Sequence, residues 1–192
     1  MASTFRYLTH PQVLIDPSVP VPDWGLSQAG LKRALAFKKS SILKDTKSVF
    51  SSGERKARET ADILALEIGV EVVIRERTHE NDRSATGFLK PSEFETIADQ
   101  FFAMPNESVR GWEKAADAQS RIVEEAEQIF RDAPEGDILM VGHGGVGTLL
   151  LCYFSGYDID RKHDQVGGGG NLFALDLETR SVVHSWLPME RV

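Results

Sequence analysis

The strongest structural signal in this chain is a strand, a glycine turn and a helix in direct succession over residues 137–154. Residues 137–141 form a compact apolar strand segment, Gly142-His143-Gly144-Gly145 a tight turn, and residues 146–154 a strongly apolar helix. A strand that passes through a short turn into a helix is typical of α/β proteins with parallel sheets. The ligand site of such a sheet lies beyond the carboxyl ends of its strands.

Strands and helices alternate along the rest of the chain. Composition and turn signals predict strands at residues 5–9, 48–51 and 70–74, and an antiparallel hairpin at 171–177 and 181–187. Helical spacing predicts helices that begin near residues 27 and 55, and helices over residues 91–102 and 113–130. This order predicts a three-layer α/β/α sandwich, an α/β fold with a mostly parallel central sheet.

Turn and capping residues divide the chain further. Ser51 and Glu54 have the spacing of a capping box, and the helix that follows them is predicted to end at Gly69. The glycine run at residues 167–170 is interpreted as a flexible linker in preference to a ligand loop. The length corresponds to one domain. We expect a single domain over residues 1–192, with a cap or insertion around residues 75–131.

Composition argues against several classes of partner. The chain has 22 Lys and Arg against 29 Asp and Glu, a formal charge of −7, which disfavours a broad nucleic-acid surface. No apolar stretch approaches the roughly 18 residues of a membrane span, and residues 1–10 lack a signal-peptide pattern. The single cysteine, Cys152, excludes a disulfide framework. We expect a cytoplasmic protein without nucleic-acid or membrane partners, and the sequence makes no prediction of its oligomeric state.

Two histidines follow predicted strands. His10 comes after the first strand and His143 after the strand at residues 137–141, while Ser51 and Ser52 occupy a third strand end. An imidazole at such a place can act as a nucleophile or a general acid, because its unperturbed pKa lies near neutrality. The alternative for each histidine alone is an ordinary hydrogen-bonded loop residue.

Cationic and glycine residues surround these strand ends. Gly144 lies in a turn that lets backbone N–H groups approach a ligand at a helix N-terminus, where anions are favoured. Arg55 and Lys56 open another helix, although Glu54 and Glu59 make a solvated, charge-balanced helix face an equal alternative. Two histidines, a basic helix start and a glycine turn together indicate a phosphate pocket.

These motifs resemble those of the histidine phosphatase superfamily, the phosphoglycerate mutase-like proteins, in the same order over nearly the whole chain. The matching segments are Leu8-Thr9-His10-Pro11 for the Arg-His-Gly motif, Leu26-Ser27-Gln28-Ala29-Gly30 for the following helix start, Ser51 to Ala61 for the second arginine motif, Thr78-His79-Glu80 for the acidic residue and Val141 to Val146 for the second histidine motif. The resemblance implies the phosphoglycerate mutase-like fold.

The resemblance also implies a role for each matching residue. His10 would be the nucleophile that becomes phosphorylated, His143 would stabilise the transferring phosphoryl group, and Glu80 would donate a proton to the leaving alcohol. The sequence leaves Glu76 and Asp82 open as alternative proton donors. Phosphoryl transfer requires mainly alignment and charge compensation, so we expect no metal and no cofactor, and a small phosphorylated substrate or phosphate as the ligand.

Two positions depart from the family pattern in a way that affects charge. Thr9 replaces the arginine before the nucleophile, and Lys56 replaces the arginine of the second motif. A lysine is a point charge and cannot bind two oxygens in a planar fork. Arg83, Arg55 and Arg58 are the candidates to supply the missing cation, and the alternative for Arg83 is a salt bridge with Asp82 or Glu80.

The function that fits these residues is that of a phosphomonoester hydrolase, a phosphatase that acts through a phosphohistidine on His10. An alternative function is that of a degenerate member of the same fold, which is weakly active or inactive and binds a phosphorylated ligand. A phosphotransferase of the phosphoglycerate mutase type is a further alternative.

Overall fold

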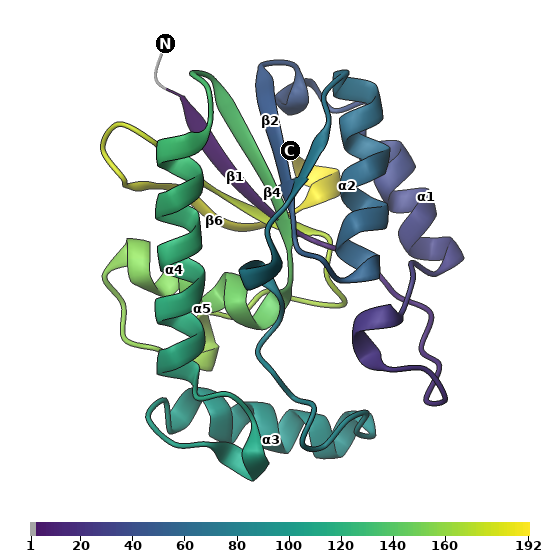
Figure 1. Cartoon of the computed structure of the whole chain (residues 1–192), viewed down its shortest axis with the longest axis vertical. Helices are drawn as coiled ribbons and strands as arrows, with labels where there is room; N and C mark the ends of the chain where they lie inside the picture. The colour runs from purple at the N-terminus through teal and green to yellow at the C-terminus, as the bar shows by residue number, and fades with distance from the viewer. Residues whose placement is uncertain (1–2) are drawn as a thin grey trace.

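The computed structural model of the protein describes residues 3–192, so Met1 and Ala2, which the predicted domain includes, lie outside the described residues. A six-stranded sheet runs through the middle, in the order β3-β2-β4-β1-β5-β6 (Figure 1). Its strands are β1 (Thr4–Thr9), β2 (Thr46–Ser51), β3 (Val72–Ile74), β4 (Asp137–Gly142), β5 (Asn171–Asp176) and β6 (Val182–Pro188). The first four are parallel and the last two form an antiparallel hairpin, which confirms the predicted mostly parallel sheet.

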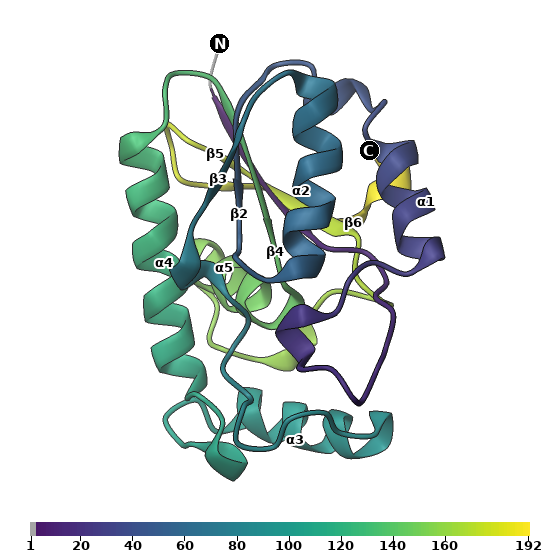
Figure 2. The same ribbon diagram turned by 45° about the vertical axis from the view of Figure 1, so that its right-hand side comes forward.

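Helices cover both faces of this sheet (Figures 1 and 2). On one face lie α1 (Gln28–Phe37) and α2 (Arg55–Ile68), and on the other α4 (Ala115–Asp132) and α5 (Gly144–Ser155). Alternate side chains of β4 point to opposite faces of the sheet and so pack against both helix layers. Ile138 and Met140 belong to the core that includes α4 and α5, whereas Leu139 and Val141 belong to the core beneath α1 and α2. The predicted three-layer sandwich is confirmed.

One helix, α3 (Pro91–Ala103), lies away from the sheet, beyond the carboxyl ends of its parallel strands (Figures 1 and 2). Its buried side chains include Ile97, Phe101 and Phe102. Phe101 packs against Trp112, with ring centroids 6.1 Å apart. Of the region predicted as a cap or insertion, α3 therefore lies beyond the strand ends, whereas α4 flanks the sheet.

The start of α2 differs from the predicted capping box. Ser51 is the last residue of β2 and is paired with Ile74 and Val141, so it cannot cap the helix. Glu54 is the N-cap residue and makes no side-chain capping hydrogen bond. Gly69 ends α2 in a left-handed conformation with φ 81°, as predicted. The helix after His143 also starts two residues earlier than expected, at Gly144.

The glycine run at residues 167–170 forms a left-handed turn against the end of β1 instead of an open linker. All four glycines have positive φ, between 53° and 77°. The Gly170 N–H donates to the His10 carbonyl at 3.1 Å, and the Arg33 guanidinium donates to the Gly169 carbonyl at 2.9 Å. A Cβ on Gly169 would lie 2.2 Å from the His10 carbonyl oxygen. The run thus fixes the backbone of His10.

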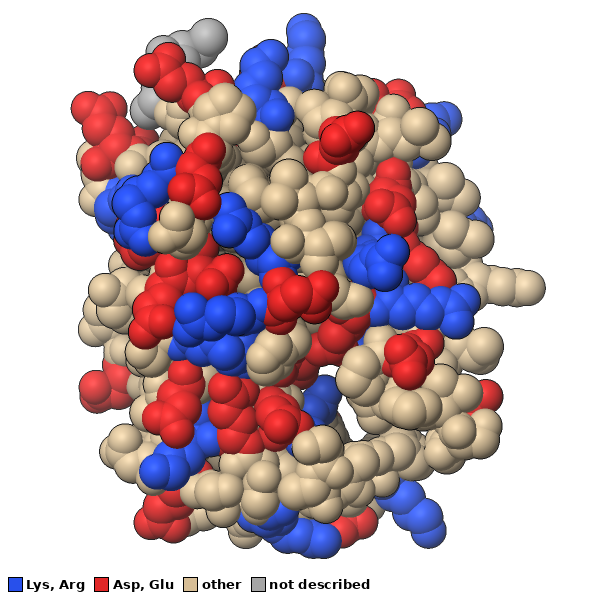
Figure 3. Space-filling model, viewed as in Figure 1, with Lys and Arg blue, Asp and Glu red and all other residues tan. Residues whose placement is uncertain are grey.

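The surface that includes α4 carries acidic and basic side chains interspersed with one another (Figure 3). Arg77, for example, pairs with both Glu124 and Glu125 of α4. In the same view the surface is hollowed between the part that contains α3 and the part that contains the connection before α1. Across residues 3–192, none of the helices combines the length and apolarity needed to cross a membrane.

Candidate active site

The pairing of β1 with β4 brings the two motif histidines together. Thr9 lies opposite Gly142 in this parallel pair, so the next residues, His10 and His143, leave the sheet side by side. The His10 N–H donates to the Gly142 carbonyl at 3.0 Å. The two imidazole rings have centroids 5.3 Å apart and planes inclined by 68°. Strand register therefore places two rings from distant parts of the chain in one site.

A backbone carbonyl fixes the tautomer of the His10 ring. Its Nδ1 lies 2.9 Å from the Pro11 carbonyl oxygen. Because a carbonyl oxygen only accepts hydrogen bonds, Nδ1 carries the proton and Nε2 carries the lone pair. Burial and the neighbouring His143 lower the pKa of His10 to about 3. At neutral pH the ring is therefore uncharged. Proline at position 11 lacks a backbone N–H but keeps its carbonyl group, so it can still orient the ring.

His143 is fully buried and held from two sides. The Tyr7 hydroxyl accepts from the His143 N–H at 2.9 Å and donates to the His143 carbonyl at 3.0 Å. On the ring, Nε2 lies 2.8 Å from the Ser52 hydroxyl and 3.5 Å from Glu54 Oε1. Burial lowers the pKa of His143. Tyr7 therefore fixes the backbone of His143, and Ser52 fixes its ring.

Lys56 and Glu54 form a buried ion pair beside His143. The Lys56 side chain is 4% exposed, and its Nζ also donates to the Val21 carbonyl at 2.9 Å. Glu54 Oε1 accepts from the Glu80 N–H at 2.9 Å. Burial opposes ionisation of Glu54, but His143 and Lys56 lower the pKa of Glu54 to about 2. The charge of Lys56 is thus balanced by a carboxylate of the chain itself.

Glu80 caps the helix N-terminus that the sequence suggested for a ligand. Its two carboxylate oxygens accept from the Gly145 N–H at 3.1 Å, the Val146 N–H at 2.9 Å and the Asn81 N–H at 3.1 Å. Burial opposes ionisation, but Arg83, His143 and the Val146 N–H keep the pKa of Glu80 below its ordinary value. A carboxylate therefore already satisfies the N–H groups of the second and third residues of α5.

Among residues 3–192, the two other carboxylates left open as proton donors make no hydrogen bond to His10, His143 or Lys56. Glu76 and Asp82 are both exposed. Hydrogen bonds from the Ser84 backbone and hydroxyl lower the pKa of Asp82. Of the three candidates, Glu80 is the one whose carboxylate contacts α5 and whose backbone contacts Glu54.

The three arginines that were candidate cations lie in different surroundings, and Arg58 is exposed on α2. Arg83 stacks over Phe94 and Trp112, with its guanidinium carbon 5.1 and 5.6 Å from the ring centroids. Among residues 3–192 it makes no ion pair with Asp82 or Glu80, yet its charge lowers the pKa of Glu80. The Arg55 side chain is 62% exposed and pairs with Glu59 at 2.7 Å. Arg83 thus lies near the cluster, and Arg55 belongs to the outer face of α2.

Thr9 is bonded into the loop that precedes β5. It is fully buried, and its hydroxyl donates to Gln165 Oε1 at 2.7 Å and accepts from the Asn171 N–H at 3.0 Å. The Asn171 side chain donates to the same Gln165 oxygen at 2.9 Å. A Cβ on Gly144 would lie 2.4 Å from Gln165 Nε2. Because Gly144 has no side chain, the Gln165 amide fits against it, at the residue that follows His143.

Three residues that contact the site, Glu54, Tyr7 and Gln165, were not predicted as site residues from the sequence. Glu54 follows a strand end and precedes Lys56 by two residues, and this position predicts a capping residue or a charge partner of Lys56 on a solvated helix face; the pair is present but buried. Tyr7 lies inside a strand, where a buried aromatic residue is ordinary core. Gln165 belongs to a loop without a motif, so no local pattern indicated that it would contact Thr9.

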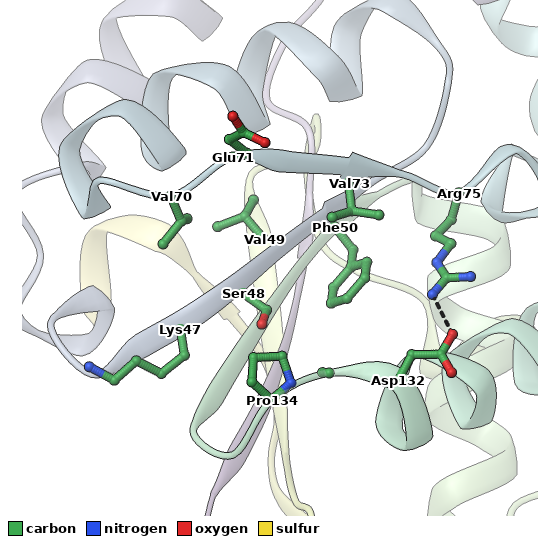
Figure 4. A pocket seen from close by; sticks show the side chains of 11 residues that line it. Lys47, Ser48, Val49, Phe50, Val70, Glu71, Val73, Arg75, Asp132 and Pro134 are labelled. Atoms are coloured by element: carbon green, nitrogen blue, oxygen red, sulfur yellow. Dashed lines mark hydrogen bonds and ion pairs between the residues drawn. The ribbon is translucent and has the colours of Figure 1, made fainter.

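A surface hollow lies away from these residues, along the edge strand β3 (Figure 4). It has a volume of about 330 Å³ and is lined by β2, by β3 and by the end of α4, where Arg75 pairs with Asp132 at 2.8 Å. It contains none of the predicted site residues. Within residues 3–192, no group of three or more His, Cys, Asp and Glu side chains is arranged to hold a metal ion.

The lowered pKa values predict a loss of stability in acid. His10 has an ordinary pKa of 6.5 and a folded pKa of about 3, so between these values the unfolded chain binds the proton that the folded chain does not. The free energy of unfolding should fall as the pH drops below about 6.5, and Glu54 should add to the loss below about 4.5.

Denaturant unfolding at a series of pH values measures this slope. The His10→Gln variant should have a shallower slope between about pH 6.5 and 4.5, because one of the groups that take up a proton on unfolding is gone. Equal slopes for the variant and the parent protein would contradict the uncharged state of His10 in the folded protein.

Comparison with known protein families identifies the family to which the chain belongs. The chain belongs to the histidine phosphatase superfamily (branch 1), whose model matches residues 19–181. The match begins after Thr9-His10-Pro11, the motif that departs from the family pattern. A comparison with curated protein sequences gave no match.

Solved structures show the same fold over almost the whole chain. Bacillus stearothermophilus YhfR has a TM-score of 0.81 at 20% identity, with 96% of this chain and 95% of that chain covered. A mycobacterial glucosyl-3-phosphoglycerate phosphatase in complex with inorganic phosphate has a TM-score of 0.76 at 20% identity, with 97% and 95% covered. TTHB049 from Thermus thermophilus has a TM-score of 0.66 at 19% identity, with 96% and 99% covered.

Proposed function

We propose that the protein is a phosphomonoester hydrolase that acts through a phosphohistidine on His10. The observation that carries the proposal is the hydrogen bond from His10 Nδ1–H to the Pro11 carbonyl, in a ring that lies beside His143. Because Nδ1 carries the proton, Nε2 has a free lone pair with which to attack phosphorus. Membership of the histidine phosphatase superfamily supports the same activity. The ligand would be a small phosphorylated molecule.

The proposed reaction has two displacements at phosphorus. His10 Nε2 attacks the phosphoryl group, the N–P bond forms, and the bond from phosphorus to the alcohol oxygen breaks with its electrons on that oxygen, which takes up a proton. Water then attacks the phosphohistidine and passes a proton to the Glu80 carboxylate, the N–P bond breaks with its electron pair returned to Nε2, and inorganic phosphate is released. Positively charged or hydrogen-bonding groups, here Lys56 and His143, would stabilise the equatorial oxygens.

Glu80 is the proposed proton donor to the leaving alcohol. In the ligand-free protein it is ionised, since its pKa is held below the ordinary value. A phosphoryl dianion that enters beside it would raise that pKa, because a like charge disfavours the ionised carboxylate. Under this proposal Glu80 binds its proton together with the substrate and passes it to the alcohol oxygen.

The test is hydrolysis of a generic aryl phosphate in the presence of a metal chelator. We expect turnover that the chelator leaves unchanged, since the proposed nucleophile and the groups that stabilise the transferring phosphoryl group are all side chains. Turnover that appears only after a divalent cation is added would contradict a metal-independent reaction, and no turnover on a broad panel of phosphate esters would contradict the hydrolase.

A second candidate function is that of a phosphate-ligand-binding protein with little or no activity. The observation that favours it is the engagement of the anion-binding groups within the chain itself, because Lys56 pairs with Glu54 and the Thr9 hydroxyl bonds to Gln165. Phosphate binding by calorimetry without turnover on the same panel of esters would support this function over the hydrolase.

A further inference from the structure

The Glu54 carboxylate contacts the groups that a phosphoryl ligand would need. It is paired with the Lys56 ammonium, accepts from the Glu80 N–H at 2.9 Å and lies 3.5 Å from His143 Nε2. The Glu54 side chain is only 10% exposed. A cation, a backbone donor and an imidazole thus converge on one internal anion, an arrangement that also suits phosphoryl oxygens.

A carboxylate and a phosphoryl group cannot share these donors. Two anions within hydrogen-bond distance of the same ammonium repel each other, and the repulsion is strong where water is excluded. Either the ligand is kept out or the carboxylate moves. Glu54 is able to move without disturbing α2, because it is the N-cap residue with an extended backbone and makes no side-chain bond to the helix N-terminus.

We propose that Glu54 occupies the phosphoryl subsite of the ligand-free protein as an internal competitor, and that an entering phosphate displaces it and takes over Lys56, the Glu80 N–H and His143. The inference rests on the proposed function only in that the ligand carries a phosphoryl group. Displacement also removes the carboxylate that accepts a hydrogen bond from the Glu80 N–H. Binding of phosphate would therefore change the surroundings of Glu80, the proposed proton donor.

Glu54→Gln tests the competition directly, with inorganic phosphate as the probe and calorimetry as the measurement. The amide keeps the shape of the side chain but loses its charge, so phosphate no longer has to displace an anion from Lys56. We expect the variant to bind phosphate at least tenfold more tightly than the parent protein. The matched control is Glu76→Gln, which removes the same charge from an exposed side chain close to Gly53 and should leave the affinity within about twofold.

A crystal structure of the parent protein with phosphate gives a second test that needs no variant. We expect the Glu54 carboxylate to have left Lys56 and phosphate oxygens to lie at Lys56 Nζ and the Glu80 N–H. A bound phosphate with Glu54 still paired to Lys56 would overturn the proposal. This structure also decides the question if Glu54→Gln does not fold.

The outcomes separate this inference from the proposed hydrolase. Equal phosphate affinity in the parent and Glu54→Gln, or an equal gain in Glu76→Gln, overturns the internal competitor and leaves the hydrolase to its own turnover assay. Tighter binding without hydrolysis of any ester supports the competitor and contradicts the hydrolase. A failure of both the parent and Glu54→Gln to bind phosphate overturns the competitor as well.

Discussion

Replacing His10 with alanine is expected to lower the rate of aryl phosphate hydrolysis by roughly a thousandfold or more, because the covalent route loses its nucleophile. The ring is half-buried at the end of β1 and contributes no hydrogen bond other than the one from Nδ1 to the Pro11 carbonyl among residues 3–192. Its removal should therefore affect turnover far more than folding. Initial rates under saturating substrate give the size of the effect.

The matched control is His184→Ala. His184 makes the same local contact, with its Nδ1 2.8 Å from the carbonyl of the next residue, but it lies on β6 and belongs to no predicted site. We expect its turnover to equal that of the parent protein. Trapping of labelled phosphate should give an acid-labile adduct in the parent and in His184→Ala but none in His10→Ala. Full activity of His10→Ala, or a label on another residue, would contradict the phosphohistidine.

The fold was largely predictable from local patterns. Segments with strand composition alternated with helical spacing, and the polar residues clustered where strands were expected to end. In a parallel sheet the carboxyl ends of neighbouring strands meet at one edge. That rule alone placed His10 and His143 at the same edge, and the observed register of Thr9 with Gly142 made them neighbours.

The partners within the site were not predictable in the same way. The sequence indicated basic residues and a helix N-terminus for an external anion, with pairing of the basic residues to Glu54 and Glu59 as an equal alternative. The structure fills both places with carboxylates of the chain, Glu54 at Lys56 and Glu80 at the start of α5. A spacing rule shows which residues share a helix face or a strand end. It does not show which of several nearby charges will pair, because pairing depends on rotamers and burial that only the assembled fold determines.

The cost of breaking the Lys56–Glu54 pair is the largest expected effect on stability. Lys56→Met keeps the apolar length of the side chain but leaves Glu54 buried without its cation, and removing one partner of a buried pair typically costs about 3–5 kcal/mol. Urea unfolding at neutral pH measures the loss. The matched control is Lys38→Met, which breaks the more exposed pair between Lys38 and Glu67 and should cost at most about 1 kcal/mol.

The double variant Lys56→Met with Glu54→Gln completes the test of this pair. If the penalty comes from an uncompensated buried charge, neutralising Glu54 should recover most of the stability that Lys56→Met loses. The loss in Lys56→Met should also shrink in acid, because without the ammonium the pKa of Glu54 rises and the carboxyl takes up a proton. A double variant as unstable as Lys56→Met would show that the Lys56 contact with the Val21 carbonyl, and not the charge of Glu54, determines the cost.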